Sequence, residues 1–330
     1  MEGVRNLSLG GVARASSFGS NAALINPSNM SMEGVFTVDP MYQLGIQSRT
    51  HGLGAVAADS LLNPRVAVGM GYLFMKGSPR VSYFDTERMD RREFKLSSYG
   101  HEVFLAISVM PVKRWLAIAL KGKYQYNSLR YRNSSGDARN AHDKLNAFGL
   151  DASVTVNFAN WVALAVTGDN LTGHHPPAYT DDRTIRLSGL PVLAGTIDHG
   201  RLSELSGYPL MLAHGLSVFP LHTRALSINF DGTYDFTTYR FEKYTRLTYG
   251  GSAEFLAGPV PLRLGTVWDS RGRGKDDDRV FLSAGIGYFR PSKAGSVGLD
   301  IGFGFRQQVS GPQKETVLGI NIGVRIQPDI

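Results

Sequence analysis

The chain has 330 residues, enough for one large domain or two ordinary ones. It contains no cysteine, which excludes disulfides, thiol nucleophiles and cysteine-ligated zinc. The net charge is +7, but the basic residues are scattered among acidic ones rather than gathered in a stripe, so we expect no nucleic-acid partner. No apolar run approaches the roughly 20 residues that a membrane-spanning helix needs, which excludes a helical membrane protein.

Residues 1–33 show no alternation and are rich in glycine, alanine and serine. Such a segment cannot build its own core, but it could pack inside the lumen of a barrel. Within it, Asn26-Pro27 predicts a rigid turn before the first strand, because proline holds the preceding residue extended and asparagine bonds nearby backbone. The sequence is equally compatible with a gating role for this turn and with a plain structural one.

From residue 34 onward, apolar and polar residues alternate with a period of two, which predicts β-strands with one apolar face. In the run SVGLDIGFGFRQQ (296–308), every second residue is apolar and the others are glycine, polar or charged. Most runs reach the roughly 9–11 residues that cross a bilayer as a tilted strand. The fourteen predicted runs are 34–47, 51–59, 65–76, 99–110, 113–126, 144–157, 160–170, 209–219, 224–236, 245–256, 260–268, 279–289, 296–308 and 315–327.

Short and long connections alternate along the chain. The short ones are 60–64, 111–112, 158–159, 220–223, 257–259 and 290–295. The long ones are 77–98, 127–143, 171–208, 237–244, 269–278 and 309–314, and the first turn, near 48–50, is an exception because it is short. This alternation of short and long connections is typical of an outer-membrane barrel with tight periplasmic turns and long external loops.

We therefore predict an all-β fold: a transmembrane antiparallel up-and-down β-barrel of about 14 strands over residues 34–330, with residues 1–33 as a hatch in the lumen. Lipid would cover the apolar face, and closure would leave no unpaired strand edge. Aromatic residues near the long loops mostly have outward parity, as in an interfacial girdle. Simple parity points Trp115 and Trp161 inward, and it places His214 outward, which predicts either a kinked strand or a shifted register there.

The N-terminal segment also carries a recognisable pattern of residues: Arg5, Gly10 and Gly11, then small residues, then Asn26 and Pro27. This pattern resembles the FadL-type outer-membrane transport family, which includes the PorV-like barrels of secretion machines. The chain departs from the pattern at Ser28, where the family usually has alanine.

The resemblance implies a fourteen-stranded barrel in the outer membrane of a Gram-negative bacterium, with a hatch that plugs the lumen and a signal peptide already removed. It also implies passive transport of hydrophobic small molecules past the hatch and through a sideways opening in the wall. The alternative is a non-transporting PorV-like scaffold in a secretion or motility machine. An open porin and a soluble β-protein are further alternatives, which the plug-like segment and the long strands disfavour.

Charged residues in the strands are the candidates for a site in the lumen. Buried charges need partners, so they either pair with one another and hold the hatch, which we favour, or bind a ligand. By alternation the charged residues facing the lumen are Lys121, Lys123, Asp151, Asp231, Asp235, Arg263, Asp300, Arg306 and Arg325.

No motif predicts an enzyme or a cofactor, because the nucleophile elbow, the P-loop and the dinucleotide fingerprint are all absent. His174-His175 and Asp276–Asp278 lack the further ligands of a metal site, so we expect no metal. The neighbouring Arg271, Arg273 and Lys275 predict contact with lipopolysaccharide phosphates. External loops 77–98, 127–143 and 171–208 are candidate surfaces for envelope protein partners, and the apolar run 185–197 in the longest of them needs burial.

Overall fold

The computed structural model describes residues 1–61, 63, 65–78, 80–85, 90–133, 142–158, 160–172, 210–236, 245–270, 278–290, 297–311 and 314–326. Within these ranges the chain forms one sheet of fifteen strands. The strands are β1 (Phe36–Gly45), β2 (Thr50–Asp59), β3 (Val66–Gly77), β4 (Arg80–Asp85), β5 (Asp90–Val112), β6 (Leu116–Asn133), β7 (His142–Phe158), β8 (Val162–Asp169), β9 (Met211–Val218), β10 (Leu226–Asp235), β11 (Arg246–Ala257), β12 (Val260–Ser270), β13 (Arg279–Arg290), β14 (Val297–Ser310) and β15 (Thr316–Ile326).

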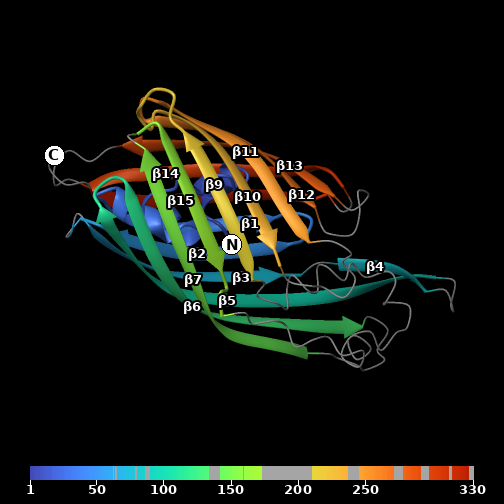
Figure 1. Ribbon diagram of the computed structural model, residues 1–330. Coiled ribbons are helices and arrows are strands. Elements are labelled where there is room, and N and C mark those ends of the chain that lie inside the picture. Colours follow the sequence, from blue (N-terminus) through green and yellow to red (C-terminus); the bar gives the residue numbers. More distant parts are fainter. Residues whose placement is uncertain are drawn as a thin grey trace.

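The sheet closes on itself into a barrel. Every neighbouring pair is antiparallel, β1 pairs with β15, and β3 pairs with β5. Without the short β4, which pairs with β5 beside the ring, fourteen strands make up the wall. Figure 1 shows these strands tilted around the barrel, with β4 lying beyond its edge. The predicted fourteen-stranded antiparallel barrel is therefore confirmed.

The predicted strands differ from the observed ones chiefly at the first long connection, 77–98. The structure places β4 and the first residues of β5 in the segment 77–98, which was predicted to be a loop. In the sequence DRREFK (90–95) charged residues stand at both parities, so no apolar face marks a strand there. Pairing within the β4–β5 hairpin extends the strand beyond the part that alternation can reveal.

The outer face of the barrel is apolar. On β6, Ile118 and Leu120 are 43% and 57% exposed, whereas Ala119 and Lys121 beside them are buried. The same alternation repeats around the ring, and a water-exposed apolar surface of that extent is foreign to monomeric soluble proteins. Lipid is the solvent that fits this face, and the closed ring satisfies its backbone hydrogen bonds internally.

The outward position of His214 does not distort the wall. The ladders from β8 through β9 to β10 run past it without a register shift, so the predicted kink is wrong. The His214 ring lies 5.7 Å from the ring of Tyr234 and 6.2 Å from that of Tyr249. These aromatic neighbours place the imidazole in the girdle at the barrel end that carries the long connections.

The prediction that Trp115 and Trp161 point inward is also wrong. Their side chains are 48% and 54% exposed. Both residues lie in turns, immediately before β6 and β8 begin, where the alternation of a strand does not apply. They therefore add to the aromatic belt at the barrel end that carries the short turns.

Residues 1–33, here called the N-terminal segment, contain two short helices, α1 (Val4–Ser8) and α2 (Gly19–Ile25), and the 3₁₀ helix η1 (Pro27–Met32). Most of their side chains are buried, and Figure 1 shows them in blue inside the ring. Helix α1 packs on β12–β15, and η1 packs on β3 and β5–β7. Pro27 begins η1, so it starts a helix rather than a turn that leads directly into β1. No helix among the described residues has the length and apolar character to cross a membrane.

Candidate functional site

A buried cluster of charges fastens the start of the N-terminal segment to the wall. The Glu254 carboxylate on β11 accepts hydrogen bonds from Arg5 and from Arg263, the latter with an N–O distance of 2.7 Å. All three side chains are less than one-tenth exposed. The motif residue Arg5 is thus held by a carboxylate that lies 249 positions away in the chain.

Three further ion pairs involve the ends of the same segment. Glu2 pairs with Arg306 of β14. Glu33 lies between Arg325 of β15, at 3.0 Å, and Arg224 in the β9–β10 turn. Burial raises the pKa of the Glu33 carboxyl, but the positive charges of Arg224, Arg325 and Arg5 lower it further than burial raises it. The pKa of Glu33 therefore lies below its usual value.

We expect the contribution of Glu33 to this attachment to vanish in acid. Because the folded-state pKa lies below the reference value of 4.5, the stabilisation is complete above that pH and is lost as the pH falls through the folded-state value. Protease cleavage of the N-terminal segment, followed from neutral pH down to about pH 3, should be faster in Glu33→Gln than in the wild type, with the difference closing at the acid end. A difference that stays constant over the whole range would contradict this assignment.

The predicted lumen charges on β6 and β7 lie together on the inner face. Lys121 and Lys123 both pair with the Asp151 carboxylate, at 2.9 and 2.8 Å. Lys121 also donates a hydrogen bond to the backbone oxygen of Leu24, at the end of α2. These charges therefore pair with each other and reach the N-terminal segment, as favoured above, and ligand binding by them stays a prediction.

The other predicted charges are spread around the ring. Asp231 accepts hydrogen bonds from the backbone N–H groups of Ala13, at 3.0 Å, and Arg14, at 2.9 Å. Asp235 is buried on the same strand, and Asp300 is partly buried on β14. The structure brings none of these into one constellation with Lys121 and Lys123. Arg263, Arg306 and Arg325 are the partners of Glu254, Glu2 and Glu33 described above.

The remaining motif residues shape the N-terminal segment itself. Gly10 and Gly11 have φ angles of +72° and +85°, a left-handed conformation that favours glycine and turns the chain after α1. Asn26 is fully buried, and its side-chain amide donates to the Arg14 backbone oxygen at 2.8 Å and to Thr155 Oγ1 at 2.9 Å. Asn26 therefore ties the segment both to itself and to β7.

Sequence reasoning missed Glu254. The signal was available, because Ala253 and Phe255 on either side are apolar, so alternation points Glu254 inward. Glu33 was missed for another reason: it lies in the non-alternating segment, where parity makes no prediction.

The backbone of the N-terminal segment lies against the wall at Gly265 on β12, and a substitution of this glycine tests the contact. A Cβ added there would lie well under 3.0 Å from the backbone of Leu9, which cannot move aside as a side chain can. We expect Gly265→Ala to displace α1 and to cost about 1–3 kcal/mol, as overpacking typically does. Gly122→Ala on β6 is the matched control, since nothing lies within 4 Å of its added Cβ. Equal urea midpoints for the two variants in lipid vesicles would contradict this contact.

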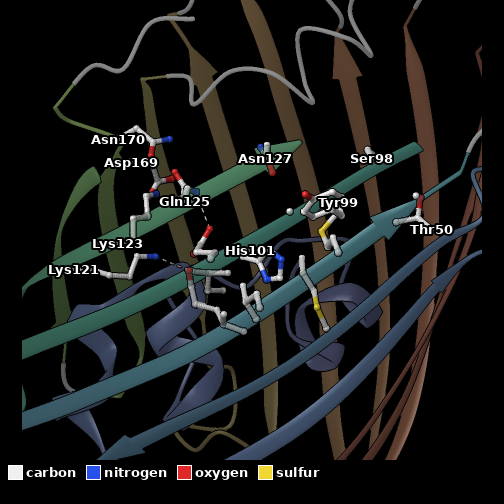
Figure 2. A pocket seen from close by; sticks show the side chains of 18 of the residues that line it. Thr50, Ser98, Tyr99, His101, Lys121, Lys123, Gln125, Asn127, Asp169 and Asn170 are labelled. Atoms are coloured by element: carbon white, nitrogen blue, oxygen red, sulfur yellow. Dashed lines mark hydrogen bonds between the residues drawn. The ribbon is translucent and has the colours of Figure 1, made fainter. Parts of the chain in front are cut away.

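A pocket of ≈ 430 Å³ lies in the lumen toward the long connections, here called the loop-side pocket. The N-terminal segment contributes Met1, Arg14, Leu24 and Ile25 to its lining. Figure 2 shows Lys121, Lys123 and Gln125 of β6 together with Asp169 and Asn170 on one side of this pocket. The remaining lining residues are Thr50, Leu73, Met75, Gly77, Ser98, Tyr99, Gly100, His101, Glu102, Asn127, Ser128 and Met211.

A second pocket, of ≈ 280 Å³, lies toward the short turns and is here called the turn-side pocket. Its lining from the N-terminal segment is Ala15, Asn29 and Met32. The wall and turns contribute Thr155, Asn157, Asn160, Ala163, Phe219, His222, Thr223 and Arg224. The N-terminal segment thus contributes lining residues to both pockets.

Several sequence candidates lie outside the described residues: His174 and His175, Asp276 and Asp277, the basic residues 271–275, the apolar run 185–197, and parts of all three candidate partner loops. Among the residues that the structure describes, no three histidine or carboxylate side chains form a cluster that could hold a metal ion.

No protein-family model and no curated protein matches the chain. Solved structures do match over nearly their full length. The CymD monoaromatic hydrocarbon channel aligns with a TM-score of 0.65 and 9% identity, covering 100% of this chain and 98% of that one. The chain has the fold of the FadL-type channels. A Pseudomonas aeruginosa FadL homologue aligns with a TM-score of 0.64 and 11% identity, covering 99% and 98% of the two chains.

The Ralstonia pickettii toluene transporter TbuX shares this FadL-type fold, with a TM-score of 0.60, 12% identity and 98% coverage of both chains. The fold predicted from the alternation and from the N-terminal residues is therefore confirmed by structures that share little sequence with this chain. Of these proteins, CymD is a hydrocarbon channel and TbuX is a toluene transporter.

Proposed function

We propose that this chain is an outer-membrane channel for the passive uptake of hydrophobic small molecules, with the N-terminal segment as its hatch. The observation that carries the proposal is the loop-side pocket: a lumen cavity in a lipid-covered barrel, lined in part by the buried N-terminal segment. The fold that this chain shares with a monoaromatic hydrocarbon channel and a toluene transporter also supports the proposal.

The size and lining of the pocket indicate the class of molecule. A dry cavity of about 150 Å³ holds benzene, and the loop-side pocket is larger, at ≈ 430 Å³. Its lining is mixed, because Lys121, Glu102 and Gln125 stand among apolar residues such as Leu73 and Met75. A molecule of one or two rings fits the volume of this pocket, and the apolar residues of the lining can contact an apolar ring such as that of toluene.

The surroundings of the channel follow from the same proposal. The lipid-covered outer face and the channel-like fold support a place in an outer membrane, which we assign to a Gram-negative envelope. Lipopolysaccharide would meet the barrel at the loop side, and any envelope partner would contact the loops there. Among the residues that the structure describes, no specific observation favours the scaffold alternative.

Native mass spectrometry of the barrel, gently extracted from its own membrane, tests this proposal. A lone barrel that carries an adduct of the mass of a small hydrophobic molecule, lost on brief heating, is the expected result. A stable complex with other envelope proteins and no small adduct would overturn the channel proposal in favour of a scaffold.

A further inference from the structure

A thin partition separates the loop-side pocket from the turn-side pocket. Arg14 lines the first pocket, and Ala15, the next residue in the chain, lines the second. On β8, Ala163 belongs to the turn-side pocket and Asp169 to the loop-side pocket. Between them, the inward and fully buried positions are those of Ala165 and Thr167. The two linings therefore meet at adjacent residues of the N-terminal segment, whereas on β8 the inward residues Ala165 and Thr167 lie between them.

The side chain of Arg14 lies in this partition and bonds neutral acceptors. Its Nη1 donates hydrogen bonds to Thr167 Oγ1 at 2.7 Å and to the backbone oxygen of Ile25 at 2.8 Å. The other three charged residues of the segment, Glu2, Arg5 and Glu33, pair with opposite charges on the barrel. Among the described residues no carboxylate lies within salt-bridge distance of Arg14. Its contacts are therefore weaker than the ion pairs that fix the rest of the segment.

A second acceptor for the Arg14 guanidinium lies nearby. The Asp231 carboxylate bonds the backbone N–H of Arg14 through Oδ2, while its Oδ1 is buried and has no partner. The Nε of Arg14 also lacks a partner. Gly215 on β9 leaves room here, because a Cβ added to it would meet both Asp231 Oδ1 and the Cβ of Arg14 within 3.0 Å. Two unsatisfied groups of opposite charge thus lie on residues that already touch.

The wall beside the partition is lined by small side chains. Apart from Thr167, Asp169 and Met211, the inward positions of β8 and β9 hold only small residues, Ala163, Ala165, Ala213, Gly215 and Ser217, and these five are buried. This narrow strip runs from the loop-side pocket to Phe219 in the turn-side pocket. Ala163 and Ala165 are packed with Ala15 and Phe219 in one buried cluster, so a passage opens along this strip only when the N-terminal segment moves away from it.

We propose that Arg14 gates a passage between the two pockets along the inner face of β8 and β9, swinging from Thr167 to Asp231 to open it. The turn-side pocket, at ≈ 280 Å³, is then the last pocket on the route, and it is large enough for a one-ring molecule. This inference rests on the proposed channel function and adds to it a route toward the turns rather than through the wall.

Ion conductance in planar lipid bilayers tests the gate without any organic ligand. Arg14→Ala should raise the steady conductance several-fold over the wild type, because the partition loses its closing side chain. Arg65→Ala, at an exposed turn position, is the matched control and should leave conductance unchanged. Asp231→Asn should not raise conductance, since it removes the carboxylate of the second acceptor. Conductance of Arg14→Ala equal to that of the wild type, or an equal rise in Asp231→Asn, would overturn the gate.

Uptake of radiolabelled toluene by cells with an intact outer membrane tests the route. Ala165→Phe fills the strip and should reduce uptake to the level of cells without the barrel. Leu164→Phe adds a ring on the lipid side of the same strand and should leave uptake unchanged, because Leu164 is 43% exposed. Full uptake by Ala165→Phe would overturn the route while leaving the channel function standing.

Failure of the proposed gate and failure of the proposed channel function give different results. If the wild type itself takes up no toluene, the proposed function fails, and the conductance of Arg14→Ala still decides whether Arg14 closes the partition. A correctly folded barrel is verified for each variant by its resistance to trypsin in vesicles, so a loss of uptake is not counted when the variant has not folded.

Discussion

Replacing Glu254 by alanine is expected to destabilise the barrel by about 3–5 kcal/mol and to release the N-terminal segment from the wall. The carboxylate accepts hydrogen bonds from both Arg5 and Arg263, and all three side chains are buried. Its removal leaves two buried guanidinium groups side by side without their hydrogen-bonded carboxylate, which is far costlier than the loss of one neutral hydrogen bond. The urea midpoint in lipid vesicles and the rate of protease cleavage within residues 1–33 measure the two effects.

A triple variant serves as the control for this prediction. Arg5→Met, Glu254→Leu and Arg263→Met together remove the charges as well as their attraction, and buried ionic clusters replaced by apolar residues often lose little stability. We therefore expect the triple variant to be more stable than Glu254→Ala alone. A urea midpoint for Glu254→Ala equal to that of the wild type would show that the cluster does not hold the segment.

Placing arginine at Leu120 is expected to destabilise the barrel by about 2–4 kcal/mol, the cost of this charge near the middle of a bilayer on the lipid face. Leu120 is 57% exposed on the outer face of β6, near the middle of the part of the strand that alternates. The neighbouring Lys121 carries a charge at nearly the same depth without this cost, because it points inward and pairs with Asp151.

Leu221→Arg is the control for depth. Leu221 is 53% exposed but lies in the β9–β10 turn, where the cost of a charge falls to about 0–1 kcal/mol. Urea unfolding in vesicles of defined lipid compares the two variants with the wild type. Similar midpoints for Leu120→Arg and Leu221→Arg would contradict a lipid-covered outer face.

The architecture was predictable because one physical signal recurs fourteen times. Lipid on one side and a lumen on the other enforce alternation along every strand. Leu120, which faces lipid, and Lys121, which faces the lumen, are one example of this alternation. The signal ends where charged residues stand at both parities, as in DRREFK (90–95), so the β4–β5 hairpin was missed. It also ends at the turns, so Trp115 and Trp161 were placed on the wrong side.

The candidate site was predictable only in part. Alternation turned Lys121, Lys123 and Asp151 inward, but it could not show that they share one ion-pair cluster, because pairing between strands depends on register. The N-terminal segment gives no periodic signal, and its helices of five and seven residues are too short for a helical pattern. The position of Arg14 between two pockets follows from tertiary packing alone.

The uptake of radiolabelled toluene by Gram-negative cells with an intact outer membrane is the most direct test of a channel for hydrophobic small molecules. Ser98 lines the loop-side pocket, so Ser98→Trp fills it, whereas Leu105→Trp adds the same ring to the lipid face. Cells with the wild-type barrel or Leu105→Trp should take up toluene faster than cells without the barrel, and Ser98→Trp should abolish the gain. Equal uptake with and without the wild-type barrel would contradict the channel function.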